Sequence, residues 1–154
     1  AGAQDIVRVA SECPGGGDPR TEGSADVVVV DAPCSSSGAL RRHPSQRWAL
    51  SENDVDGFAS VQLQVLREAS VLVRPGGRLV YATCSLLRAE NGAVAEAFEA
   101  ATAGEDNTAF EPWPFAAHGG SPAHHRTLLP HVEGTDGFFI ARWKRRSGVL
   151  PVEK

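Results

Sequence analysis

The sequence predicts an α/β fold built on a parallel, doubly wound sheet. Residues 26–30 read DVVVV, a short continuous apolar run typical of a parallel strand that is buried on both faces. A second apolar run, GRLVYAT, occupies residues 77–83. One helical pattern lies between the two runs and another follows the second. This alternation of strand and helix favours a parallel sheet with right-handed crossovers.

The first half of the chain contains two expected strands and one expected helix. Residues 5–10, DIVRVA, predict a short strand, and a loop rich in Gly and Pro leads from it to the strand at 26–30. Ser51 and Asp54 resemble a capping box in which Asp replaces the usual Glu or Gln, so we expect a helix to begin there. The helix is expected to end at RPGG, and its apolar positions recur every three or four residues: Val55, Phe58, Val61, Val65, Ala69 and Leu72.

The second half is less regular. After the strand at 77–83 we expect a helix that ends near Gly104, with Val94, Ala97, Phe98 and Ala101 on one face. Residues 104–135 predict a long loop with one strand around FEPWPF. Residues 136–145 predict the last strand, and 146–154 a flexible tail.

Composition limits the classes of function. The 154 residues are 42% hydrophobic, enough for one domain with a core, and the net charge of −4 means that any nucleic-acid surface must be local. No apolar run is long enough to span a membrane, and the N-terminus shows no signal peptide. Because the chain begins with Ala1 and contains no Met, we expect a piece of a longer protein. The expected location is the cytoplasm, or an organelle or the nucleolus in a eukaryote.

Two of the three cysteines follow expected strands. Cys34 and Cys84 each lie just beyond a strand's carboxyl end, where sheets of this kind bind ligands. If the two strands are neighbours, the thiols meet over one crevice. The alternative is that each cysteine is a small packed hydrophobic residue, which is how we interpret Cys13. The spacing of Cys and His residues does not indicate a metal site or a disulfide framework.

Three segments resemble the signature blocks of the Sun/Fmu-type RNA cytosine-5 methyltransferases. They are DAPCSSSGALRRHPSQRW (31–48), LVYATCSLLRAENGAVAEAF (79–98) and EGTDGFFIARWKR (133–145). The pairing of DAPC with TCS, joined by RRHP, is the specific feature. The resemblance implies a partial class I (Rossmann-like) methyltransferase sheet, strands 3 to 7, without the first strands and their glycine-rich cofactor loop. It assigns residues 1–145 to the C-terminal portion of an S-adenosyl-L-methionine-dependent methyltransferase domain.

The resemblance also implies a reaction, methyl transfer to C5 of cytosine in RNA, with ribosomal RNA as the expected substrate. Cytosine C5 is a poor nucleophile, and a thiolate that adds to C6 activates it toward the methyl group of the cofactor. By resemblance, Cys84 is the nucleophile and Cys34 assists release of the product. By resemblance, Asp31 contacts both the cytosine and the cofactor. Pro33 and Glu12 are the other expected cofactor contacts, and Glu12 stands where the family usually has Asp.

Other residues receive supporting roles. We expect Arg41, Arg42, His43 and Arg47 to contact the RNA backbone, although such a cluster alone also fits a solvated loop. Trp48 could stack on a base or pack. Glu90 and Asn91 are interpreted as residues that cap or orient the helix after Cys84, with or without a catalytic duty. Gly134, Asp136 and Gly137 are expected to form a turn that borders the cleft.

Two alternatives stay open. The chain could be a truncated or diverged module that binds RNA or a protein partner without turnover. It could also belong to a DNA cytosine-5 methyltransferase that uses Cys34 as nucleophile, although TCS and the lack of a recognisable target-recognition domain disfavour this. In each case we expect a monomer without a metal ion.

Overall fold

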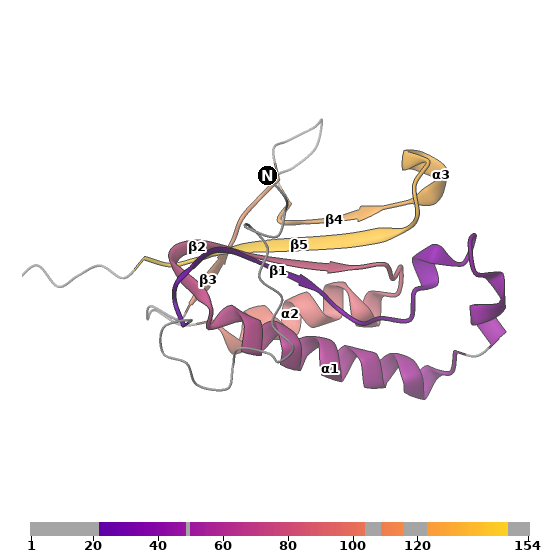
Figure 1. The fold of residues 1–154 in the computed structure, drawn as a ribbon, viewed down its shortest axis with the longest axis horizontal. Helices are drawn as coiled ribbons and strands as arrows, with labels where there is room; N and C mark the ends of the chain where they lie inside the picture. The colour runs from indigo at the N-terminus through magenta and orange to yellow at the C-terminus, as the bar shows by residue number, and fades with distance from the viewer. Residues whose placement is uncertain (1–21, 49, 104–108, 116–122, 148–154) are drawn as a thin grey trace, which may run out of the picture.

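The computed structural model describes residues 22–48, 50–103, 109–115 and 123–147. Outside them lie the expected strand at 5–10, Glu12, Cys13, the expected helix stop Gly104 and residues 148–154 of the expected tail. The described residues form a mixed five-stranded sheet with helices α1 and α2 packed on the same face (Figure 1). Within these ranges, no helix has the length and apolar character needed to cross a membrane.

The sheet is parallel at one end and antiparallel at the other. Strands β1 (Ala25–Asp31) and β2 (Val73–Thr83) run parallel, as expected for the first two apolar runs. Strand β5 (Phe138–Arg145) pairs antiparallel with β2, and β3 (Phe110–Pro112) and β4 (His125–Leu128) both pair with β5. The sequence did not predict β4 because HRTL is short and polar and lacks apolar alternation. The sequence did not predict helix α3 (Pro130–Glu133) either, because four residues are too few to show a helical pattern.

Helix α1 (Glu52–Ser70) begins at the expected capping box. The Ser51 hydroxyl accepts a bond from the Asp54 amide at 3.3 Å, and the Asp54 carboxylate accepts one from the Ser51 amide at 2.9 Å. The helix ends at Ser70, before the expected RPGG, because strand β2 already begins at Val73, opposite Ala25. Leu72 therefore lies outside the helix.

The core lies between the sheet and the two helices. Leu66 of α1 and Phe98 of α2 (Gly92–Ala101) are fully buried against Leu79, Tyr81 and Trp143. The rings of Phe98 and Trp143 lie 5.0 Å apart, and the Trp143 indole N–H donates to Glu99. Apolar burial on this one face thus fixes how the strands and helices pack.

The expectation that the DVVVV strand is buried on both faces is wrong for the described residues. Val30 faces the helices and is only 4% exposed, whereas Val27 and Val29 are 49% and 64% exposed. Strand β1 is the edge of the sheet, and α1 and α2 both lie on the other face from these two valines. Among the described strands, β1 therefore pairs only with β2 and presents an exposed apolar face on the side away from the helices.

We predict that Ser51→Ala lowers the free energy of unfolding by about 1 kcal/mol, because the amide at the third position of α1 loses its cap. Urea unfolding measures the change. Ser60→Ala, on the exposed interior of the same helix, is the matched control and should change stability by less than about 0.5 kcal/mol. Equal effects of the two substitutions would contradict the role of the cap.

Candidate functional site

The two thiols meet at the carboxyl ends of neighbouring strands. Asp31 at the end of β1 stands opposite Ala82 of β2, so the loops that follow leave the sheet at the same edge. The Sγ atoms of Cys34 and Cys84 lie 3.2 Å apart, although the residues are 50 positions apart in sequence. Both thiols are free and partly buried. This confirms the expectation that the cysteines share one site.

The environment of Cys34 changes the chemistry of its thiol. Burial, together with the adjacent Cys84, raises the pKa of Cys34 from its ordinary value of 9.0 to about 11. Cys34 is therefore a protonated thiol near neutral pH, and it can donate its S–H to the sulfur of Cys84. The Cys84 sulfur also lies 3.5 Å from the hydroxyl of Ser36, a residue with the left-handed φ of 56°.

Two glycines bring a third segment against the thiol-bearing loops. The Gly38 amide donates to the carbonyl oxygen of Cys84 at 2.8 Å, and the Gly137 amide donates to that of Gly38 at 3.0 Å. A Cβ at Gly38 would overlap the Gly137 carbonyl and lie 2.8 Å from the Cys84 oxygen. The expected turn at 134–137 therefore borders the site, with Gly134 in the left-handed region at φ 70°.

Asp31 is the last residue of β1, and Pro33 follows it in the loop that carries Cys34; both residues are exposed. Among the described residues, the Asp31 carboxylate has no hydrogen-bond or ion-pair partner, so a ligand could use it. Pro33 lines a groove of about 400 Å³ along α1, together with Asn53, Asp54, Gly57, Phe58 and Val61. An exposed carboxylate at a strand end fits a positively charged group such as the sulfonium or ammonium of S-adenosylmethionine. The third expected cofactor residue, Glu12, is not described.

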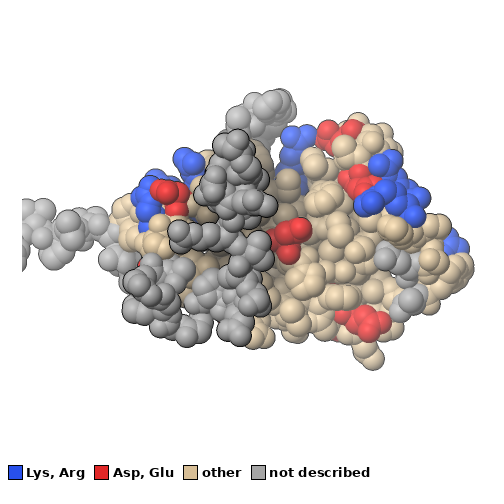
Figure 2. Space-filling model, viewed as in Figure 1, with Lys and Arg blue, Asp and Glu red and all other residues tan. Residues whose placement is uncertain are grey.

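Arg41 and Arg42 share one carboxylate at the border of the site. Their Nε atoms donate to the two oxygens of Asp136 at 2.5 and 2.6 Å, and both guanidinium groups are more than half exposed. The bond from Arg41, with help from Arg42, holds the pKa of Asp136 below its usual value. Two cations against one anion leave a positive charge, and Figure 2 shows basic and acidic side chains side by side at the end of the molecule that carries α3.

The remaining residues of the basic loop are exposed as well. The guanidinium of Arg47 lies 4.1 Å from the centre of the Trp48 ring, which is 78% exposed. Both belong to the short helix η3 (Pro44–Trp48), which follows the exposed His43. This arrangement suits contact with phosphates and bases, but the role of these residues stays a prediction.

Asn91 occupies the N-cap position of α2, but neither it nor Glu90 forms a side-chain cap, so the capping part of their interpretation was wrong, and the orienting part stays a prediction. Asn91 makes no side-chain bond to the helix; it accepts from Thr83 at 2.6 Å and donates to the Ser85 carbonyl at 2.8 Å. Glu90 is fully buried and bridges the two loops through Ser35 and Ser85. The residues preceding α2 therefore connect the cysteine loops.

Sequence reasoning also missed Gln62. Its amide is fully buried and donates to the Pro33 carbonyl at 2.9 Å and to Glu90 at 3.1 Å. A signal was available: Gln62 lies four positions after Phe58 and four before Leu66, so it belongs to the apolar stripe of α1. A polar residue on a buried face needs a buried partner.

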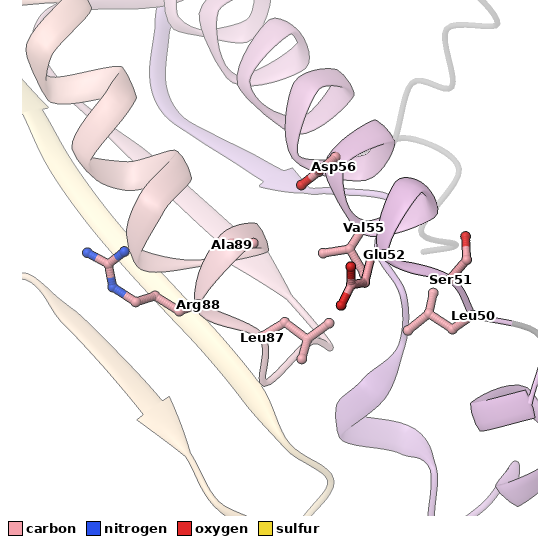
Figure 3. A pocket seen from close by; sticks show the side chains of 8 residues that line it. All are labelled: Leu50, Ser51, Glu52, Val55, Asp56, Leu87, Arg88 and Ala89. Carbon is pink, nitrogen blue, oxygen red and sulfur yellow. The ribbon is translucent and has the colours of Figure 1, made fainter.

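A second groove, of about 530 Å³, lies between the start of α1 and the loop that follows Cys84. Figure 3 shows Leu87 and Val55 facing each other across it, with Glu52 beside them and Arg88 directed away. Its lining is mostly apolar, and no sequence motif predicted it. In the described part of the chain, no three His, Cys, Asp or Glu residues are grouped so that they could hold a metal ion.

Known proteins match the chain over most of its length. Residues 7–144 match the profile of a family described as 16S rRNA methyltransferase RsmB/F. Ribosomal RNA small subunit methyltransferase B of Pasteurella multocida is 36% identical over 120 residues, which are 78% of this chain and 26% of that protein. Its namesake in Xylella fastidiosa is 43% identical over 117 residues, covering 76% and 26%. The chain thus spans about a quarter of the length of these relatives.

A solved structure has the same fold. The crystal structure of NSun6 from Pyrococcus horikoshii with SFG aligns with a TM-score of 0.65 at 26% identity, covering 81% of this chain and 31% of that one. SFG is an analogue of S-adenosylmethionine. The likeness confirms the partial class I methyltransferase fold that the sequence predicts.

We predict that Gly38→Ala lowers the free energy of unfolding by about 2 kcal/mol or more, because the new Cβ meets two backbone carbonyls that side-chain motion cannot relieve. Thermal unfolding measures the loss. Gly57→Ala is the matched control: its Cβ would meet nothing within 4 Å, and in a helix the change should stabilise by up to about 1 kcal/mol. A neutral Gly38→Ala would show that the loops do not pack so closely.

We predict that Cys34 is alkylated by iodoacetamide with a midpoint near pH 11 in the folded protein and near pH 9 in urea, because burial disfavours its thiolate. Peptide mass mapping after alkylation follows Cys34 separately from the other cysteines. Since the folded-state pKa is the higher one, this group's contribution to stability is present below pH 9 and is lost as pH rises through 11. Equal midpoints would contradict the assignment of Cys34 as a buried, protonated thiol.

Proposed function

The chain belongs to the RsmB/F family of 16S rRNA methyltransferases, and from this premise we propose that it carries the catalytic thiols for methylation of cytosine C5 in RNA. Ribosomal RNA is the proposed substrate class. The observation that carries the proposal is the 3.2 Å contact between the Cys34 and Cys84 sulfurs at the ends of two parallel strands. Because the chain spans about a quarter of its relatives' length, the activity is proposed for the full natural gene product.

The first step is covalent activation of the base. The Cys84 thiolate adds to C6 of cytosine, and the electron pair of the C5–C6 double bond becomes available for attack from C5. The exposed Asp31 carboxyl group holds the proton at N3, which offsets the charge that develops on the ring. The high pKa of Cys34 supports Cys84 as the attacking group, because the Cys34 S–H stabilises the neighbouring thiolate by donating to it.

S-adenosylmethionine, when bound, supplies an electrophilic methyl group. Asp31 and Pro33 are the described residues proposed to contact it, with Glu12 as a further proposed contact. After methyl transfer the C5 proton leaves to water, the bond between Cys84 and C6 breaks, and its electron pair returns to sulfur. Cys34 assists this release by hydrogen bonding to the departing thiolate.

The basic loop is proposed to hold the RNA. Arg41 and Arg42 already share Asp136, so their guanidinium groups are held at the turn that borders the site before any substrate arrives. Guanidinium groups fixed in this way are suited to phosphate oxygens. His43 and Arg47 extend the same surface, and Trp48 offers an exposed ring for a base.

We predict that Cys84→Ala abolishes methyl transfer to RNA, whereas Cys34→Ala accumulates RNA bound covalently to the protein, because attack still occurs and release fails. Labelled RNA that migrates with the protein on a denaturing gel reports the adduct, and labelled methyl groups report turnover. Cys13→Ala is the matched control and should be neutral.

Activity that survives Cys84→Ala would sink the proposal. Methylation of DNA in preference to RNA would instead support a DNA enzyme, and binding of RNA by a product that never transfers methyl groups would support a non-catalytic binding module.

A further inference from the structure

We propose that Glu90 is the positioning residue of the site: its buried carboxylate joins the two cysteine loops and sets the distance and hydrogen bonding of their thiols. This inference rests on the proposed function, because it concerns the same two cysteines. Glu90 does not touch the reacting atoms itself and acts through the serines beside each thiol.

The position of Glu90 between the loops is the first support. Its carboxylate is fully buried and accepts four hydrogen bonds from three segments of the chain. Ser35, next to Cys34, donates its amide at 2.8 Å and its hydroxyl at 2.5 Å. Ser85, next to Cys84, donates its hydroxyl at 2.5 Å, and Gln62 of α1 donates at 3.1 Å. One group thus contacts the sequence neighbours of both thiols.

The direction of the hydroxyl bonds is the second support. A carboxylate can only accept, so the hydroxyl hydrogens of Ser35 and Ser85 must both point toward Glu90. The oxygen of Ser85 is then free to accept, and it receives bonds from the Leu87 amide at 3.1 Å and the Ser37 hydroxyl at 3.0 Å. The Ser37 oxygen in turn accepts from the Leu86 amide at 2.9 Å. Glu90 therefore directs a chain of bonds that shapes the backbone after Cys84.

The amide of Gln62 can be oriented in one way only. If its oxygen and nitrogen were exchanged, the oxygen would face the Pro33 carbonyl and the Glu90 carboxylate, which also only accept. The orientation with Nε2 toward both acceptors leaves Gln62 Oε1 buried without a partner among the described residues. An unpaired buried oxygen costs free energy of folding. The fold tolerates this cost because the Pro33 carbonyl and the Glu90 carboxylate both require a donor.

Four donors are needed because a buried charge without partners is highly unfavourable. The same argument makes glutamine a poor substitute, although its size is nearly equal. An amide at position 90 offers one acceptor group and one donor group, so at least one hydroxyl must turn its hydrogen away. At Ser85 that reversal conflicts with the Leu87 amide and the Ser37 hydroxyl, because both already donate to its oxygen. Glu90→Gln therefore changes hydrogen-bond polarity with little change in packing.

The test is bridging of Cys34 and Cys84 by dibromobimane, which becomes fluorescent when it alkylates two neighbouring thiols. It is carried out on the full natural gene product with Cys13→Ala as background. We expect Glu90→Gln to slow bridging by about tenfold to a hundredfold, the range expected for loss of a hydrogen bond to a charged group. Glu96→Gln, on the exposed face of α2, is the matched control and should bridge at the unaltered rate.

A purely structural role for Glu90 would lower the unfolding temperature and leave the bridging rate of the folded protein unchanged, and that result would overturn the proposal. If Glu90→Gln does not fold, Ser85→Ala replaces it, since this variant keeps the carboxylate but removes its bond to the Cys84 loop. Slower bridging by folded Ser85→Ala supports the proposal, and an unaltered rate overturns it. Bridging needs neither RNA nor cofactor, so failure here is distinguishable from failure of the proposed methyl transfer.

Discussion

Parallel pairing of β1 with β2 is the constraint on which the site depends. The register that sets Asp31 opposite Ala82 makes both strands end at the same edge, so that Cys34 and Cys84 can meet. The same register points Val30 and Tyr81 into the core. A slip by one residue would turn these side chains to the other face. The register of β1 with β2 therefore fixes both the burial of the core and the meeting of the thiols. The antiparallel strand β5 completes the core from the other side of β2 and brings the turn at 134–137 against the loops.

The surroundings of Cys34 change the chemistry of its thiol. Burial favours the protonated form of Cys34, and its sulfur lies 3.2 Å from the sulfur of Cys84. Asp31, the last residue of β1 and three residues before Cys34, is exposed and lacks a partner among the described residues. Two partly buried thiols and an accessible carboxylate thus lie together at the carboxyl ends of β1 and β2. The buried carboxylate of Glu90 holds the backbone of both loops beneath them.

The sequence predicted the elements that depend on local pattern. The capping box, the two apolar strands and the meeting of the thiols are confirmed, since apolar runs and strand ends are visible in the residues themselves. The hydrogen bonds of Glu90 were not predicted, because a helix cap is a local interpretation, whereas its partners Ser35 and Gln62 come from distant segments. Strand β4 was missed because it is held by pairing with β5 rather than by apolar alternation. The exposed face of β1 was missed because continuous valines do not show what covers them.

The central claim is that Cys84, and not Cys34, attacks the base. RNA that carries 5-fluorocytosine tests it most directly, because fluorine at C5 cannot leave as the proton does and the adduct persists. The full natural gene product would be incubated with this RNA and S-adenosylmethionine, digested, and the modified peptide sequenced by mass spectrometry. The account predicts that the cytosine is attached to Cys84 in the segment YATCS. Attachment to Cys34 in the segment DAPCSSS would contradict it and reverse the roles of the two thiols.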